Sequence, residues 1–433
     1  MTPQSNFMIL APINPAHEPD LRLLLESMTR EPGLAVPSNP TLPFAQFKQI
    51  HFARFVILDD QTLDDVEVYG VPRVNFPKYL AFLGDCDGSA EDLLREFAKH
   101  AKDGLRAIFQ HCADYPSTND LLAWMKSHSV RPAANYINWL GRTVQQVQEE
   151  EDLHQALQNY LESKASSFAS MQPRQIRDAL TQYIATEHQS GRLLLSPAIA
   201  APLGWQIKNA LNLVGVPLLL LLASPLLLLA LPIVLILLRQ RERSDPEIAP
   251  RVDPEHADRL ALIEDRDITN QFSAMGSIKP GLVRRILMLL VLAAIDYSAR
   301  HIFNRGRLAR VTTIQFARWV FLDGGRRVLF ASNYDGSLES YMDDFINKVS
   351  FGLNVVFGNG IGYPRTRWLL LDGAKDEQTF KRYLRRHQVP TQVWYNSSPG
   401  LSALDKRRNA LIREGLEKHS MTEPEIQEWL QLL

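Results

Sequence analysis

The stretch IHFARFVILD, residues 50–59, decides the fold, because it returns as IQFARWVFLD at residues 314–323, a spacing of 264 residues. A second block, residues 82–116, matches residues 330–364 at eleven positions, now at a spacing of 248 residues. The change in spacing places sixteen extra residues in one loop of the first copy. A repeat this long predicts a duplicated domain and not a solenoid.

Each copy shows the order strand, helix, strand, strand, helix, strand, which is that of a ferredoxin-like domain. The elements expected in the first copy are Phe7–Ile13, Asp20–Met28, Ile50–Leu58, Tyr79–Asp85, Ala90–Lys102 and Leu105–Cys112. Those expected in the second are Phe272–Ile278, Leu282–Ile302, Thr313–Leu322, Arg327–Asn333, Leu338–Val349 and Leu353–Gly358. Further strands are expected near Asn135–Trp139 and Gln392–Tyr395. We therefore expect an α+β fold in which two ferredoxin-like modules pack as an intramolecular pseudo-dimeric α+β barrel.

An apolar block separates the copies. Leu213 to Leu238 carries no charge, and a run of about 20 apolar residues is enough to span a bilayer core. Pro217, Pro225 and Pro232 interrupt it and favour a bent, re-entrant hairpin, although a buried helix of a soluble protein is the alternative. Leu282–Ile302 has too short an uncharged core to span, so it either lies in the membrane interface or packs on its own sheet.

These boundaries predict five segments. Module 1 covers residues 1–145, a helical connector 146–203, the membrane hairpin 204–243, a polar linker 244–265 and module 2 residues 266–433. Basic residues flank the apolar block on both sides, and the N-terminal residues lack the pattern of a signal peptide. Both modules are therefore expected to face the cytoplasm, at the inner membrane of a bacterium.

Composition excludes several classes of function. The formal net charge is -1, and nucleic-acid binding needs a clustered excess of Lys and Arg, so no nucleic-acid partner is expected. The two cysteines, Cys86 and Cys112, are too few for a disulfide framework or a four-thiolate metal site. The sequence also lacks a Walker A loop, a Rossmann glycine fingerprint and a G-x-S-x-G elbow, which disfavours nucleotide-driven chemistry and serine hydrolysis.

A repeated Asp-Gly-Ser stands where a strand meets a helix in each copy, at Asp87 and at Asp335. Glycine permits the tight turn there and serine can cap the helix, so the motif has a structural explanation. The functional alternative makes Asp87 and Asp335 proton-transfer carboxylates at the mouth of the barrel.

Arg54 and Arg318 occupy equivalent positions on strands that are otherwise apolar. A buried charge needs a partner, so these arginines either form structural salt bridges, to Asp59, Asp87 or their repeat mates, or bind a ligand anion. The anion could be a carboxylate, a lipid headgroup or a haem propionate. The polar residues Asn333, Asn359 and Arg365 of the second copy are candidates for the same ligand-binding site.

The tandem plan, together with the run Gly84-Asp85-Cys86-Asp87-Gly88, resembles the dye-decolourising peroxidases, whose haem site carries a G-x-x-D-G motif. The resemblance implies haem between the copies, an Asp acting on peroxide with a distal Arg, and a His ligand to iron. Only Asp87 carries over by motif position; the second copy has Ser332 in place of the first glycine. Separately, residues 313–364 resemble an uncharacterised family of bacterial membrane-associated proteins, which brings no established activity.

The histidines are scattered and form no HExxH pattern. His111 and His387 lie at element ends and are the candidates for a metal or haem ligand. Two functions remain open. One is a membrane-associated oxidoreductase of peroxidase type that uses haem on an apolar or lipid-derived substrate. The other is a non-catalytic membrane-bound module that binds a lipid or a partner protein in the same cleft.

Overall fold

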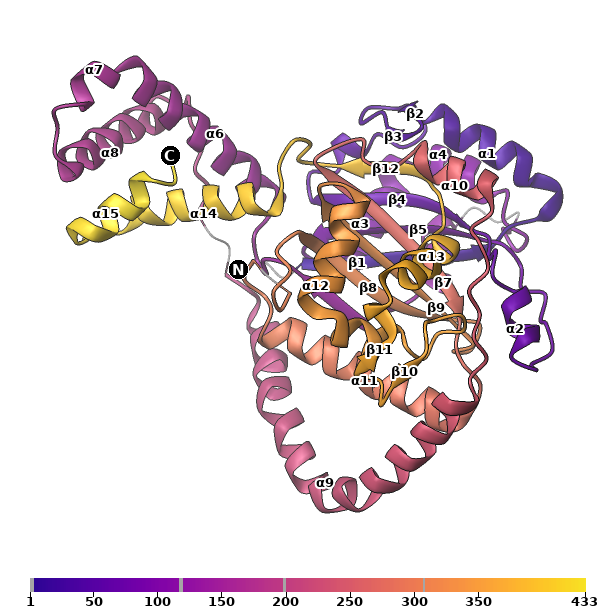
Figure 1. Cartoon of the computed structure of the whole chain (residues 1–433). Coiled ribbons are helices and arrows are strands. Elements are labelled where there is room, and N and C mark those ends of the chain that lie inside the picture. Colours follow the sequence, from indigo (N-terminus) through magenta and orange to yellow (C-terminus); the bar gives the residue numbers. More distant parts are fainter. Residues whose placement is uncertain (1–3, 117–119, 198–199, 307) are drawn as a thin grey trace.

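The computed structural model describes residues 4–116, 120–197, 200–306 and 308–433 as a mixed α+β fold. Two β-sheets form the body, a helical arm projects from one side, and one long helix curves below it (Figure 1). The first sheet is mixed, with strand order β1-β5-β4-β12-β3-β2. Its strands are β1 Gln4–Pro12, β5 Tyr79–Asp87, β4 Ile50–Leu58, β12 Thr391–Asn396, β3 Gly33–Ala35 and β2 Thr29–Glu31.

The second sheet is antiparallel, with strand order β6-β8-β9-β7. Its strands are β6 Ala134–Ile137, β8 Ile314–Leu322, β9 Arg327–Asp335 and β7 Thr269–Ser277. A separate hairpin pairs β10 Thr366–Arg367 with β11 Leu371–Asp372. The order β1-β5-β4 in one sheet thus parallels β7-β9-β8 in the other, and both β4 and β8 shift register at their second residue, His51 and Gln315.

Each sheet is completed by a strand from the other half of the chain. β6 precedes the apolar helix in sequence but pairs with β8, which follows it. β12 lies near the C-terminus but pairs with β4 of the first half. Main-chain hydrogen bonds therefore interlock the two halves, and neither sheet is complete without both.

Apolar side chains fill the space between the two sheets. Met8, Val56 and Leu83 of the first sheet cluster with Val320 and Leu329 of the second, all of them buried. Because side chains alternate along a strand, the remaining apolar positions face outward and are covered by helices. Those helices are α1 Glu18–Ser27, α3 Ala90–His100, α4 Lys102–Phe109 and α5 Leu121–Ser127 on the first sheet, and α11 Leu282–His301, α12 Leu338–Phe357 and α13 Glu377–His387 on the second.

The fourth strand expected in each βαββαβ copy, its sixth element, is helical. Leu105–Cys112 falls largely in α4, where Leu105, Ile108 and Phe109 are buried at the i, i+3, i+4 spacing of a helix face. Leu353–Gly358 continues α12 beyond a kink at Val349. Short apolar runs do not distinguish a buried strand from a buried helix, which explains the error. The structure does not confirm duplicated ferredoxin-like modules, because the last element of each copy is helical and the exchanged strands β12 and β6 pair with β4 and β8.

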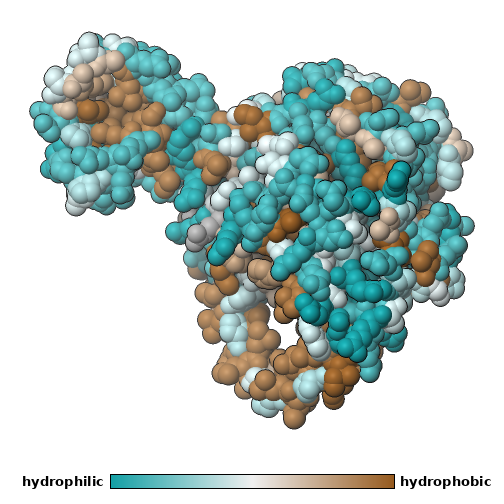
Figure 2. Space-filling view, viewed as in Figure 1, coloured by the Kyte–Doolittle hydropathy of each residue, from teal (hydrophilic) through white to brown (hydrophobic). Residues whose placement is uncertain are grey.

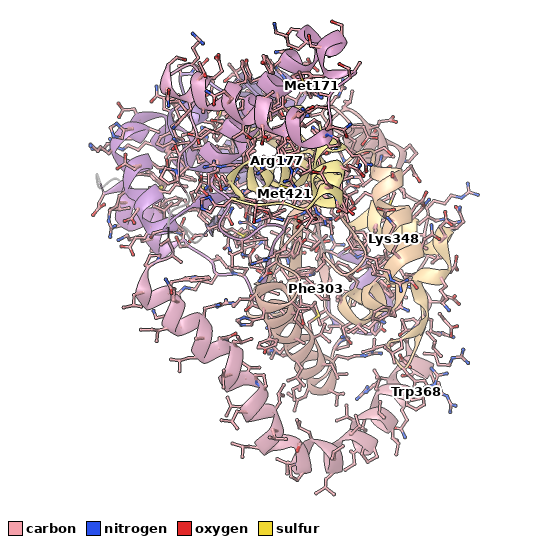
Figure 3. The ribbon with its side chains drawn as sticks, turned by 90° about the vertical axis from the view of Figure 1, so that its left-hand side faces the viewer. Met171, Arg177, Phe303, Lys348, Trp368 and Met421 are labelled. Carbon is pink, nitrogen blue, oxygen red and sulfur yellow. The ribbon has the colours of Figure 1, made fainter. Side chains whose placement is uncertain are left out.

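The helical arm combines α6 Val144–Ser163, α7 Ala165–Phe168 and α8 Pro173–Gln189 with the C-terminal α14 Ala403–Glu417 and α15 Glu423–Leu430. It has its own core, in which Leu157 and Leu180 meet Ile412 and Trp429. Arg177 of α8 donates to the main-chain oxygens of Gly415 and Lys418, at 3.1 and 2.7 Å, and it lies near Met421 in Figure 3. The predicted connector 146–203 therefore packs with the end of module 2.

The apolar block forms one continuous curved helix, α9 Leu203–Ser244, which we call the arch. It contains Pro217, Pro225 and Pro232, which are eight and seven residues apart. At 3.6 residues per turn these spacings are close to two turns, so the three prolines lie on one side of the helix. Each proline bends a helix away from its ring, and bends in the same direction add up. The arch accordingly leaves the body and returns to it (Figure 1).

Two further short helices, α2 Asp64–Val68 and α10 Pro254–Ala261, belong to connecting segments. α2 lies in the segment of residues 59–78 between β4 and β5, whereas the matching connection between β8 and β9 spans only residues 323–326. Three 3-10 turns, Pro15–His17, Phe44–Gln46 and Gly373–Lys375, complete the described elements.

Candidate functional site

Arg54 and Arg318 reach across the space between the sheets in opposite directions. Arg54 of β4 donates to the main-chain oxygens of Phe272 and Ser332, both at 2.9 Å, and to the side chain of Asn333. Arg318 of β8 donates to the equivalent oxygens of the first sheet, Phe7 at 2.9 Å and Gly84 at 3.0 Å, and to the carboxylate of Asp85. Both guanidinium groups are therefore bound by the opposite sheet.

The two arginines differ in their charge environment. Asp85 is an acid where the second copy has the amide of Asn333, so Arg318 is paired with a carboxylate and Arg54 with neutral acceptors. Burial, followed by repulsion from Arg318, lowers the pKa of Arg54. Burial raises the pKa of Asp85, although Arg318 and Arg54 oppose this effect. The acidic partners expected for the arginines were Asp59, Asp87 or their repeat mates. In the structure Asp85 is the partner of Arg318, and Arg54 is bonded to neutral acceptors.

Asp87 and Asp335 stand at one end of the sheets and hold helix N-termini. Asp87 accepts from the His51 ring Nε2 and from the main-chain N of Val144, each at 2.8 Å. Asp335 accepts from Gln315 at 2.8 Å, from Thr269 at 2.9 Å and from the main-chain N of Ala403 at 2.6 Å. A carboxylate is favourable at the positive end of a helix, which is a structural use for both residues. Burial raises the pKa of Asp335.

A small polar cavity lies between the residues that contact Asp87 and those that contact Asp335. His51, Gln315 and Lys406 line it, and its volume is about 40 Å³. Lys406 donates to Gln315 at 2.6 Å, and burial of its ammonium lowers its pKa to about 8. An amine with that pKa can exchange protons near neutral pH. The space admits water, which needs roughly 10–15 Å³, but is far below the roughly 300–1,000 Å³ of small-molecule sites.

The two histidines proposed as ligands lie apart from this cavity. His111 follows α4 on the outer, helix-covered side of the first sheet, with its ring 5.9 Å from that of His17. His387 is buried at the end of α13, and its Nδ1 lies 2.8 Å from the Tyr383 main-chain oxygen. A Cβ at Gly276 would lie 3.0 Å from the Nε2 of His387, so that ring edge is packed against β7.

Haem does not fit this arrangement. The interior between the sheets is filled by apolar side chains, and the cavity beside Asp87 and His51 measures about 40 Å³. His387 is 4% exposed, with its Nδ1 beside the Tyr383 main-chain oxygen and its ring against Gly276, and the guanidinium groups of Arg54 and Arg318 are bound to main-chain oxygens. Among residues 4–116, 120–197, 200–306 and 308–433, no cluster of three or more His, Cys, Asp or Glu side chains could hold a metal ion.

The remaining predicted residues, Asn359 and Arg365, lie instead where the arch returns to the body. Asp245, which follows the arch, is 2.8 Å from both Lys279 and Arg284. Arg284 also donates to Asn359 at 3.2 Å, and Arg365 donates to the main-chain oxygen of Asp245 at 2.9 Å. Burial lowers the pKa of Lys279 to about 8, against the attraction of Asp245.

A second buried acid fixes the same end of the arch. Glu242 is 1% exposed and accepts from Thr366 at 2.9 Å and from the main-chain nitrogens of Trp368 and Leu369 at 2.8 Å. Arg239 lies over the Trp368 ring, 5.9 Å from its centroid, and Figure 3 shows Trp368 beside this limb of the arch. Sequence reasoning missed Glu242 and Asp245, although an acid within the basic flank and a second one just after it were a usable signal.

The first limb of the arch is tied to the other end of α11. Tyr297 donates to the main-chain oxygen of Leu213 at 3.0 Å, and the ring of His301 lies 2.8 Å from the Asn212 side chain. Arg284, near the start of the same helix, contacts Asp245 beyond the second limb. Helix α11 thus joins the two limbs at their base.

The arch exposes its apolar side chains almost completely. Leu222, Leu226 and Leu229 are 70–73% exposed, and none of the most apolar 18-residue window is buried. Figure 2 shows the arch as a nearly continuous apolar band, separated from the body by a gap. Among the described residues, α9 is the one helix long and apolar enough to cross a membrane, judged by length and composition. Surface of this kind is typical of membrane contact.

Helix α11 adds to the same surface. Leu282, Ile286, Leu289 and Leu290 are exposed, whereas Met288 and Leu292 on the opposite side are buried against the second sheet. Both expectations for this segment are thus compatible with one helix, since one face packs and the other is open.

No family model matches the chain, and neither a curated protein nor a solved structure matches it. The function is therefore inferred from the fold and its surfaces.

Proposed function

We propose that this protein is a non-catalytic, monotopic membrane-bound module that holds its body on one side of the membrane and binds lipid there. The exchange of strands carries this proposal. β6 and β12 each pair with a strand that lies on the other side of the arch in sequence. A single crossing of the membrane would place the paired strands on opposite sides and make both pairings impossible. The two ends of the arch therefore belong on the same side.

The length of the arch supports a re-entrant path. The uncharged run of 26 residues, Leu213 to Leu238, measures about 39 Å along a helix, or roughly 20 Å per limb once bent. The hydrocarbon core is about 30 Å thick, so each limb passes through about one leaflet and cannot reach the other surface. The exposed apolar face of α11, at the base, then lies in the interface, as monotopic helices do.

The body supports an origin by duplication. Equivalent strand orders, register shifts at His51 and Gln315, and reciprocal contacts of Arg54 and Arg318 are what two ferredoxin-like modules in a pseudo-dimeric barrel would produce. We assign the body to the cytoplasmic side, because Arg239, Arg241 and Arg243 follow the apolar run of the arch and Lys208 precedes it. A peroxidase-type activity has no comparable support, since the cavity next to His51, the partner of Asp87, measures about 40 Å³.

The test is flotation of the purified full-length protein with phosphatidylcholine vesicles. The variant Leu226→Arg places a charge on a side chain that is 73% exposed in the arch, and Leu404→Arg does so at a 53% exposed position on α14. We expect Leu226→Arg to weaken vesicle binding, because a central arginine costs about 2.5–3.5 kcal/mol in a membrane helix, and Leu404→Arg to bind like the wild type. Equal flotation of both variants, or reporter fusions placing the two termini on opposite sides, would refute the proposal.

A further inference from the structure

A groove lies where the extra loop of the first copy meets the start of α11, and we call it the insertion groove. It encloses about 580 Å³, within the usual range for small-molecule sites. Apolar side chains of the loop form one wall: Leu63, Val66, Val71, Pro72, Val74 and Phe76. Ile278, Pro280, Leu282 and Ile361 form the other.

The groove depends on the sixteen residues that distinguish the two copies. The segment 59–78 supplies its outer wall, and the matching turn at residues 323–326 supplies only part of its floor. Asp60 and Phe76 anchor the segment on Arg327, at 3.4 Å and at 4.2 Å from the ring centroid. Asp65 pairs with Arg386 at 2.8 Å. The fold does not need this loop, since the second copy lacks it, which favours a role in binding.

The charges at the groove are all of one sign. Lys279, Arg285 and Arg326 are among its lining residues, and none of the described lining residues is acidic. The ammonium of Lys279 is held by Asp245 and by the Gly358 main-chain oxygen. Arg285 donates only to the main-chain oxygen of Gly324, at 2.9 Å, and Arg326 is exposed without an ion pair among the described residues. Two guanidinium groups are thus available to an anion.

The groove is continuous with the membrane-facing surface. Leu282 lines the groove and is also the first residue of the exposed apolar face of α11, where it is 72% exposed. We propose that the insertion groove binds an anionic phospholipid of the membrane that holds the arch, with Arg285 and Arg326 on its phosphate and an acyl chain along the apolar walls. Guanidinium groups bind phosphate oxygens through paired, charge-assisted hydrogen bonds. This inference rests on the proposed membrane association.

The test uses the full-length protein in mild detergent with dioctanoyl phosphatidylglycerol and dioctanoyl phosphatidylcholine as probes, titrated calorimetrically. We expect the wild type to prefer phosphatidylglycerol, and Arg285→Gln/Arg326→Gln to weaken that binding by about tenfold or more without changing phosphatidylcholine binding. Val71→Asn/Val74→Asn should weaken both lipids. The matched control Arg241→Gln/Arg243→Gln, at the end of the arch, should keep the preference.

Two results would overturn the lipid site: equal binding of both lipids by the wild type, or a preference that survives in Arg285→Gln/Arg326→Gln. Competition by inorganic phosphate as strong as that by phosphatidylglycerol would also overturn it, because the site would then read the anion alone. Flotation with phosphatidylcholine vesicles separates this failure from that of the proposed function. If the wild type floats but shows no lipid preference, only the proposed lipid site in the insertion groove is refuted. If the wild type does not float, the proposed membrane association is refuted.

Discussion

Arg54 and Arg318 occupy equivalent positions in the two sheets but have different partners. Arg318 neutralises a buried carboxylate, while Arg54 faces only neutral acceptors. Removing one partner of a buried ion pair leaves an uncompensated charge, which costs about 3–5 kcal/mol. The sequence alone favours a structural role for Arg54 and a ligand-binding role for Arg318. The contacts with Asp85 lead us to expect the larger loss of stability from replacing Arg318.

We predict that Arg318→Met destabilises the protein by about 3–5 kcal/mol, because Asp85 stays buried without its cation. Arg54→Met should cost less, since it also relieves repulsion between two buried guanidinium groups. Urea unfolding of both variants measures this. Asp85→Asn, which copies the amide of Asn333, should partly rescue Arg318→Met in a double-mutant cycle. Equal losses for the two arginine variants, with no rescue, would contradict the assignment.

The buried ammonium of Lys406 predicts a pH dependence. Its pKa is lowered from 10.5 to about 8, so the unfolded chain binds more protons between these values. The free energy of unfolding therefore rises by up to about 3 kcal/mol as pH increases from 8 to 10.5, because Lys406 loses its charge. Below pH 8 the buried ammonium is charged and its full destabilising effect is present. Comparison with Lys406→Met should reveal this slope. Lys99→Met, at an exposed position, should show no such difference.

At the scale of elements, side chains hold both limbs of the arch, while its apolar middle is exposed. Glu242 and Asp245 fix the second limb, and Asn212 and the main-chain oxygen of Leu213 are bonded in the first limb. The curvature follows from three prolines on one helix side, so it belongs to the element itself. What the body adds is the position of the two ends, both of which meet α11.

We predict that Asp245→Ala detaches the C-terminal end of the arch. Lys279 and Arg284 are 4% and 2% exposed, and without Asp245 they would keep buried charges unpaired, a loss of about 3–5 kcal/mol. Hydrogen exchange at residues 239–245 should rise sharply in this variant, and its melting temperature should fall. Glu247→Ala, two residues on at an exposed position, serves as the control. Identical exchange in the two variants would show that the ion pairs do not hold the arch.

At the scale of the whole molecule, the exchange of strands makes the body one unit. Each half contributes the strand that closes the other half's sheet, and the arm likewise joins α6 and α8 to α14 and α15. These contacts cross the boundaries between the predicted segments 1–145, 146–203 and 266–433. The halves interlock through hydrogen bonds and a shared core.

We predict that a chain cut between Pro250 and Arg251, in an exposed segment between α9 and α10, stays assembled. A protease site inserted there should give two fragments that elute together in detergent, because the β6–β8 and β12–β4 pairings do not depend on the peptide link. The fragments should separate only in denaturant. Independent elution of the halves under native conditions would rule out the interlocked body.

The amino-acid sequence by itself determined those elements that depend only on neighbouring residues in the chain. The repeated strands at residues 50–58 and 314–322, the 26 uncharged residues and the three prolines of the arch follow from periodicity, composition and backbone sterics. Only the tertiary structure decided which strands pair, that Leu105–Cys112 is helical, and that Asn359 and Arg365 hold the arch while Arg54 and Asn333 join the sheets. These outcomes depend on contacts between residues far apart in the chain. The periodicity of apolar residues along a segment does not specify which distant segment it will contact.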